Sequence, residues 1–135
     1  MAEIIVPSLG TSFSSYTFTD VSDDLFSEAE FRFGQYADRM VFRTLDIQQD
    51  LAAQGFIAGK YDLVLVGNNL QMVQDQEKAL SSIRQLLKPG GYLIGASPIT
   101  DDSLRLGIFM SDCPEWWAGA DAGRMTLDSW GSLLR

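Results

Sequence analysis

Histidine is absent from the 135-residue sequence, and cysteine occurs once, as Cys113. Histidine is the usual side chain for proton transfer near neutral pH and the commonest metal ligand. Any general base would therefore be a carboxylate, a lysine, a tyrosine or Cys113, and we expect no metal site. A single cysteine cannot form an internal disulfide and fits a reducing compartment, so we expect a cytoplasmic protein. Without a histidine to activate it, Cys113 is not expected to be a nucleophile.

Basic residues are scarce as well. The chain has 10 lysine and arginine residues against 18 aspartate and glutamate residues, which gives a net charge of −8. Affinity for nucleic acid comes mainly from basic side chains that contact phosphates. This balance therefore argues against a nucleic-acid partner, and equally against an anionic membrane surface.

Long apolar runs are also missing. No run approaches the roughly 20 residues that a membrane-spanning helix needs. The N-terminal stretch MAEIIVPSLG has neither the basic start nor the apolar core of a secretory signal. With 46% hydrophobic and 21% charged residues, the composition is typical of a soluble globular chain. The length is sufficient for one core, so we expect residues 1–135 to form a single domain.

The apolar pattern predicts alternating strands and helices. Aromatic and β-branched residues predict a strand over 16–20. Ser22 is expected to cap a helix over 23–38, in which apolar residues recur at helical spacing. The next strand is expected over 40–47, followed by a helical or irregular turn over 48–57.

The second half of the chain repeats this alternation up to about residue 100. A strand is predicted over 61–66, and Asp75 is expected to cap the following helix. Proline and glycine within 88–91 end that helix, and a further strand begins at Tyr92 and ends at Pro98. Near-continuous apolar strands separated by helices indicate an α/β fold with a mostly parallel sheet covered on both faces.

Polar residues follow three of the predicted strands. Asp20 and Asp46 lie near the ends of two of them, and the third runs into Gly67-Asn68-Asn69-Leu70-Gln71. Ligands of open α/β sheets bind at the carboxyl ends of the strands. Two interpretations remain open for these residues. They serve as turn formers and caps, or they form a site in which the amides orient a carbonyl substrate.

Several sequence motifs occur together in a specific order. They are YTFTDVS, YADRMVFRTLDI, GKYDLVLVGNNLQ, LLKPGGYL, LRLG, WWAGADAGR and a final W-x-x-LLR. From about Val6 to Arg135 the chain resembles the C-methyltransferase domain of fungal highly reducing polyketide synthases. That domain is a class I S-adenosylmethionine (SAM) methyltransferase, which methylates the α-carbon of a β-ketoacyl chain on an acyl carrier protein. The resemblance implies a Rossmann-like sheet.

The resemblance also implies roles for single residues. Asp20 matches the acid that would bind the ribose hydroxyls of SAM, and Asp46 matches the acid that would reach the adenine. Trp116 and Trp117 match a lid over the acyl chain. They could equally be core or interface anchors, because tryptophan buries a large area and is enriched at interfaces.

Three departures from the family pattern decide the functional prediction. The sequence begins inside the helix that follows the family's glycine-rich loop, so we expect a partial fold without the first strand and that loop. Gln71 replaces the family's catalytic histidine, and glutamine cannot take a proton at neutral pH. Ser97 replaces the glutamate that partners that histidine. We therefore expect no methyl transfer and no SAM cofactor.

Two hypotheses for function follow. The first is a pseudo-enzyme or scaffold of polyketide biosynthesis that binds a polyketide intermediate or a synthase partner such as an acyl carrier protein. The alternative is a small SAM-independent cyclase, isomerase or hydrolase that positions a reactive polyketide in the old acyl-chain cleft. Its catalytic residues would be Asp20, Asp46, Asn68 and Gln71, and its ligand-binding residues would be Asn69, Ser97, Trp116 and Trp117.

The expected loss of the first strand also bears on assembly. An unpaired strand edge has to be covered by another chain or by rearrangement. We therefore expect a homodimer, formed by paired edges or by the Trp116–Trp117 surface. The remaining possibility is a fragment of a larger synthase.

Overall fold

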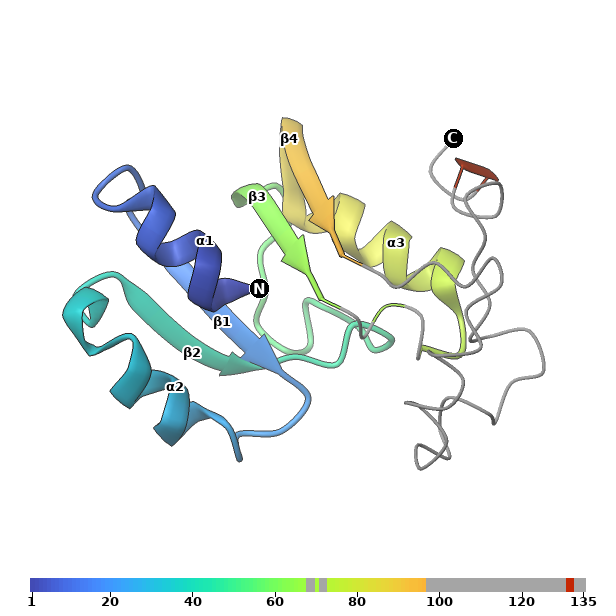
Figure 1. Ribbon diagram of the computed structural model, residues 1–135. Coiled ribbons are helices and arrows are strands. Elements are labelled where there is room, and N and C mark those ends of the chain that lie inside the picture. Colours follow the sequence, from blue (N-terminus) through green and yellow to red (C-terminus); the bar gives the residue numbers. More distant parts are fainter. Residues whose placement is uncertain (68–69, 71–72, 97–130, 133–135) are drawn as a thin grey trace, which may run out of the picture. The chain divides into compact units, whose positions relative to one another are not determined.

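The computed structural model describes residues 1–67, 70, 73–96 and 131–132 (Figure 1). The chain divides into two compact units, Met1–Phe56 and Ile57–Arg135, called unit 1 and unit 2 below. Each unit contains one pair of parallel strands with helical segments. The α/β class expected from the sequence is therefore confirmed.

Unit 1 is built around strands β1 (Tyr16–Asp20) and β2 (Met40–Thr44). They pair in parallel without a register shift, from Tyr16 opposite Met40 to Asp20 opposite Thr44. Parallel neighbours need a long crossover connection, and α2 (Phe26–Arg32) with the 3₁₀ helix η1 (Gly34–Tyr36) supplies it. An N-terminal helix, α1 (Ala2–Leu9), precedes β1, as expected from the resemblance.

The core of unit 1 joins both helices to the strands. One buried cluster contains Val6 of α1, Ala29 of α2, Phe33 directly after α2, and Met40 of β2. An aromatic group lies against it, in which the Phe18 ring contacts those of Phe26, Phe33 and Phe42 at centroid distances of 5.7–6.4 Å. Burial of several large rings supplies most of the apolar stabilisation available to so small a unit.

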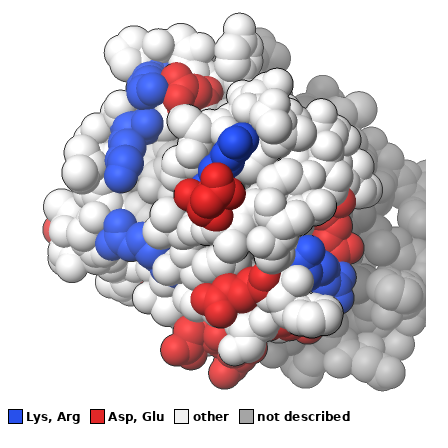
Figure 2. Space-filling model, turned by 90° about the vertical axis from the view of Figure 1, so that its left-hand side faces the viewer, with Lys and Arg blue, Asp and Glu red and all other residues white. Residues whose placement is uncertain are grey.

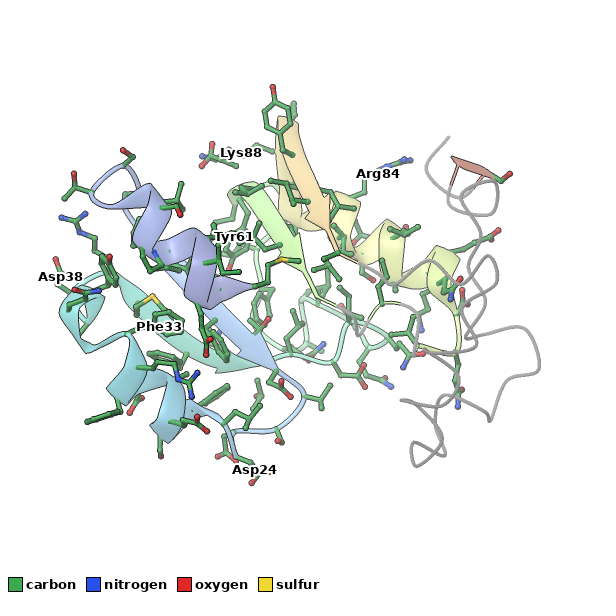
Figure 3. All side chains as sticks on the ribbon, viewed as in Figure 1. Asp24, Phe33, Asp38, Tyr61, Arg84 and Lys88 are labelled. Atoms are coloured by element: carbon green, nitrogen blue, oxygen red, sulfur yellow. The ribbon has the colours of Figure 1, made fainter. Side chains whose placement is uncertain are left out.

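Unit 2 contains β3 (Tyr61–Val66), α3 (Gln76–Leu86) and β4 (Leu87–Gly95). The strands pair in parallel, but the register shifts between Tyr61, opposite Leu87, and Leu63, opposite Tyr92. The residues Lys88-Pro89-Gly90-Gly91 lie in this irregular part of β4. There Lys88 Nζ lies 2.8 Å from each carboxylate oxygen of Asp62, which ties the bulged segment to β3. Figure 3 labels Lys88.

Strands β1 and β3 have the bounds that the sequence predicted, 16–20 and 61–66. The other strand boundaries differ. β2 ends at Thr44 and not at Ile47, because the backbone turns at Asp46. β4 begins at Leu87, directly after the helix, and not at Tyr92, because residues before the bulge already pair with β3.

The predicted helix over 23–38 was too long. α2 begins at Phe26 and ends at Arg32, and a 3₁₀ turn follows at Gly34. Ser22 does not cap it: its hydroxyl donates to the Asp24 carboxylate at 2.9 Å. Short polar side chains offer the backbone several local hydrogen bonds, and here those bonds hold a turn before the helix.

The predicted cap of α3 is confirmed. Asp75 precedes the helix, and its Oδ1 accepts a hydrogen bond from the Lys78 amide at 2.9 Å. An apolar stripe of this helix, formed by Ala79, Ile83 and Leu86, is buried. α3 packs through this stripe on β3 and β4.

Asp75→Ala is expected to lower the free energy of unfolding by about 1 kcal/mol, because the first turn loses a partner for one of its free amides. Asp75→Asn keeps an acceptor oxygen and is the matched control, with a smaller expected loss. Urea unfolding followed by circular dichroism measures both. Equal losses for the two variants would contradict the assignment of the cap.

Figure 2 shows several basic side chains beside acidic ones, and further acidic side chains on the lower part of the same face. In unit 1, Arg32 pairs with Glu3 and with Glu28, and Arg39 lies 3.4 Å from Asp38. Each exposed pair of this kind contributes little to stability. No helix in the described ranges is long and apolar enough to cross a lipid bilayer.

Candidate functional site

The carboxyl edge of the β1–β2 pair brings Asp20 and Asp46 together. Asp20 is the last residue of β1, and Asp46 lies two residues beyond the end of β2. The amide of Leu45 donates to the Asp20 carbonyl at 2.8 Å, so the two segments run side by side past the formal end of β2. Two carboxylates from neighbouring parallel strands thus stand at the edge where α/β sheets bind ligands.

Asp20 and Asp46 differ in how firmly they are held. The Asp20 carboxylate accepts one long hydrogen bond, from the Ser22 amide at 3.4 Å. Asp46 is fixed at three atoms: Oδ1 accepts from the Gln48 amide at 2.9 Å, and its own backbone amide and carbonyl both bond to the Gln54 side chain. Asp46 is therefore the better ordered of the two acids.

The Gln54 side chain organises the segment that follows β2, residues 45–56, called the Asp46 loop below. Its Oε1 accepts from the Asp46 amide at 2.8 Å, and its Nε2 donates to the carbonyls of Asp46 at 2.9 Å and of Asp50 at 3.1 Å. One amide group thus satisfies three backbone groups. Paired backbone groups are needed wherever a loop is partly buried, so Gln54 substitutes for regular secondary structure here.

Arg43 of β2 closes the far end of the Asp46 loop. Its Nη2 donates to the Gln54 carbonyl at 2.8 Å and its Nη1 to the Gly55 carbonyl at 3.1 Å. The guanidinium also lies over the Phe56 ring, 4.3 Å from the centroid, and Phe56 is itself buried. Hydrogen bonds and a cation–π contact both hold the Arg43 guanidinium. These contacts attach the Asp46 loop to β2.

Gly55→Ala should destabilise the chain by about 1–2 kcal/mol for the backbone alone, because Gly55 has a φ of 77°. A Cβ there would also lie 2.9 Å from Arg43 Nη2, so a further loss is expected. Gly59→Ala is the matched control, since Gly59 has a φ of 64° with open space around it. Chemical unfolding compares the two variants, and an equal cost would rule out the contact with Arg43 as a factor.

All the other predicted site residues lie outside the described part of the chain. They are Asn68, Asn69, Gln71, Ser97, Trp116 and Trp117. Cys113 lies outside it too. The structure therefore brings together Asp20 and Asp46, and the placement of the amide cluster stays a prediction.

Tyr16, the first residue of β1, is partly buried. Burial raises the pKa of the Tyr16 hydroxyl, which makes its phenolate still rarer at neutral pH and unsuited to act as a base. In the same part of the chain, no three acidic or cysteine side chains gather closely enough to hold a metal ion.

A groove of about 730 Å³ in unit 2 lies away from the carboxyl end of β4. It is lined by residues of α3 between Glu77 and Arg84, by residues of β4 between Leu87 and Leu93, and by Ser132. Figure 3 labels two of the lining residues, Arg84 and Lys88. Lys88 is already bound to Asp62, so its charge is not free for a ligand.

The residues that hold the Asp46 loop were not expected from the sequence. Residues 48–57 were predicted only as a turn, and Arg43 only as part of a strand. Gly55 was the one residue in the sequence that could have indicated the loop conformation, since glycine commonly marks a positive φ. The acceptors of Arg43 are backbone carbonyls, which every residue has. No side-chain motif in the sequence therefore indicates the contact.

Comparison with known proteins places this arrangement in a family. Residues 1–93 match the family model of the methyltransferase domain. The chain is 46% identical over 135 residues to the hybrid PKS-NRPS synthetase fsa1 of Fusarium sp. (strain FN080326), and 49% identical over 132 residues to the hybrid PKS-NRPS synthetase mpsA of Macrophomina phaseolina (strain MS6). These alignments cover 96% and 97% of this chain but only 3% of either relative.

Solved structures agree with this placement. The CurJ carbon methyltransferase superposes with a TM-score of 0.83 at 29% identity, over 96% of this chain and 36% of that one. The trans-methyltransferase CalH, solved as a complex with SAH, gives a TM-score of 0.79 at 35% identity, over 90% of this chain and 35% of that one. Together with the match to the family model, they confirm the resemblance to C-methyltransferase domains and the partial class I methyltransferase fold: the chain belongs to the methyltransferase domain family.

Proposed function

We propose that this chain is part of a polyketide synthase C-methyltransferase domain that transfers no methyl group and serves to bind a polyketide intermediate or a synthase partner. The observation that carries the proposal is the replacement of the family's proton-transfer pair. Gln71 stands at the position of the histidine, Ser97 stands at that of the glutamate, and the chain has no histidine elsewhere.

The missing base matters because of the chemistry of α-methylation. The α-carbon of a β-ketoacyl chain must lose a proton before it can attack a methyl group. A positioned general base typically accelerates such a step by about 10²–10⁴. Glutamine has no proton-accepting form at neutral pH, and serine without a base beside it cannot replace a carboxylate. The proposal therefore expects any residual transfer to be slower by at least this factor.

The proposal extends to the cofactor. The family resemblance assigns Asp20 and Asp46 to the binding of SAM, and both lie in the described part of the chain. Hydrogen bonds to charged groups contribute about 1.5–3 kcal/mol each, whereas association costs at least about 4 kcal/mol. Two such contacts leave at most about 2 kcal/mol, which corresponds to a Kd of some tens of millimolar. We therefore propose that SAM is not a cofactor of this chain and binds no more tightly than its nucleoside part.

The proposal also states what the chain binds. The paired tryptophans Trp116 and Trp117 and the amides at Asn68 and Asn69 supply apolar area and hydrogen bonds suited to an acyl chain or a carrier protein. A homodimer belongs to the same proposal. Light scattering at micromolar concentration tests it, and a monomer would count against it.

A methyl-transfer assay tests the proposal directly. The chain is incubated with SAM and a β-ketoacyl pantetheine mimic, and the acyl product is analysed by mass spectrometry. The CurJ carbon methyltransferase, handled in the same way, serves as the comparison enzyme. We expect no gain of a methyl group with the chain. A methylated product would refute the proposal.

The same assay distinguishes the alternative function from the proposed one. A product of unchanged methyl count but altered structure would indicate a cyclase, isomerase or hydrolase. In that case Asn68→Ala and Gln71→Ala should abolish its formation. Under the proposed function, neither variant changes any product.

A further inference from the structure

The groove between α3 and β4 in unit 2 has an apolar lining. Its apolar residues are Leu80, Ile83, Leu87, Pro89 and Leu93. Ile83 is 1% exposed, and the three leucines are half-buried. The volume of about 730 Å³ lies within the range of about 300–1,000 Å³ that is usual for small-molecule sites, which are lined mostly by apolar side chains. The size and lining of the groove therefore suit the hydrocarbon chain of a ligand.

Arg84 adds a positive charge to this lining. The other basic lining residue, Lys88, is bound to the Asp62 carboxylate at 2.8 Å. The Arg84 side chain is exposed and has no hydrogen bond or ion pair with the residues that the structure describes. A planar guanidinium presents paired N–H donors that match the two oxygens of a carboxylate. Arg84 is therefore available to hold an anionic group in the groove.

Glu77 gives the groove a polarity. It lines the same groove seven residues before Arg84 on α3, which is about 10 Å along the helix axis. An anion is attracted by Arg84 and repelled by Glu77. The charged end of a ligand is therefore directed to the C-terminal end of α3.

We propose that the α3–β4 groove binds a linear acyl carboxylate, with the carboxylate on the Arg84 guanidinium and the acyl chain against the apolar lining. A carboxylate neutralises the single charge of Arg84, whereas a phosphate ester would bring about −1.5 to −2. The inference goes beyond the proposed function, whose acyl ligand is expected at the amides and the paired tryptophans.

The probe for this inference is octanoate, compared with octanol, which has the same chain length without the charge. Binding to the 135-residue chain is followed by nuclear magnetic resonance, from the shifts of the amides of α3 and β4 at millimolar ligand. We expect octanoate to bind about tenfold more tightly than octanol, as one hydrogen-bonded charge pair would provide. Because Arg84 is exposed, this preference should shrink as salt is added. Acetate, which lacks the chain, should shift none of these amides.

Arg84→Gln is expected to remove the preference for octanoate and to leave the binding of octanol unchanged. A loss of structure would weaken both ligands, so the ratio of the two affinities separates recognition from folding. Lys78→Gln is the matched control, because Lys78 is an exposed cation of the same helix that does not line the groove. This variant loses the same charge from the chain and should keep the preference.

Four results would overturn the inference. They are the absence of shifts in α3 and β4 with octanoate, an equal affinity of the parent chain for octanoate and octanol, a preference that survives in Arg84→Gln, and an equal loss of the preference in Lys78→Gln. The methyl-transfer assay judges the proposed function separately. Methyl transfer by a chain that still binds octanoate through Arg84 would refute the proposed function and keep this inference.

Discussion

Replacing Phe33 by alanine is expected to destabilise unit 1 by about 3–5 kcal/mol. Phe33 is 4% exposed and belongs to the cluster that joins α1, α2 and β2. Its ring also contacts Phe18 of β1, 6.4 Å away between centroids. Truncation leaves a cavity among groups that cannot all close in on it, since they come from different elements. Small domains have a total stability of about 5–15 kcal/mol, so this single change removes a large part of it.

Phe31→Ala is a close control for that variant. Phe31 lies in α2, two residues before Phe33, is the same residue type and is 91% exposed. Its removal should change the free energy of unfolding by no more than about 0.5 kcal/mol. Urea unfolding with tryptophan fluorescence and circular dichroism measures both variants. If the two losses were similar, the assignment of Phe33 to the core would be wrong.

Ile83→Ala is expected to have the largest effect in unit 2, with a loss of about 2–5 kcal/mol. Ile83 is 1% exposed and lies in the middle of α3, on the face that packs against β3 and β4. The helix is the crossover connection between these parallel strands, which need such a cover on their face. Loss of the contact therefore weakens the strand pair as well as the helix.

The control for Ile83 is Ile57→Ala in the same unit, because Ile57 is 64% exposed. Amide hydrogen exchange resolves the effect by residue. Ile83→Ala should lower the protection of β3, α3 and β4, whereas Ile57→Ala should leave it unchanged. Unaltered protection in Ile83→Ala would contradict the proposed role of this contact.

The sequence was informative where a pattern had one physical solution. β1 and β3 are runs of β-branched, aromatic and aliphatic residues, and both were predicted with the correct bounds. The cap at Asp75 followed from its position before an amphipathic stretch. The start of α2 could not be predicted in this way, because Ser22 and its acidic neighbours can bond in a turn as well as in a cap.

The candidate site was predictable only in outline. The ends of two strands indicated Asp20 and Asp46, and the structure places both at one edge. Sequence alone could not reveal that Gln54 orients Asp46, since the bonds depend on a loop conformation and on carbonyl acceptors common to every residue. Irregular loops lack the periodicity on which such predictions rest.

The contacts of Arg43 have a consequence for ionic strength. Among the residues that the structure describes, its partners are neutral: two backbone carbonyls and the ring of Phe56. Dissolved ions screen attractions between exposed opposite charges, such as Arg32 with Glu3 or Lys88 with Asp62, over a Debye length of about 8 Å at physiological salt. A guanidinium held by short bonds to dipoles and a buried ring depends far less on that screening. The Asp46 loop therefore keeps its shape across salt conditions that loosen the ion pairs on the surface.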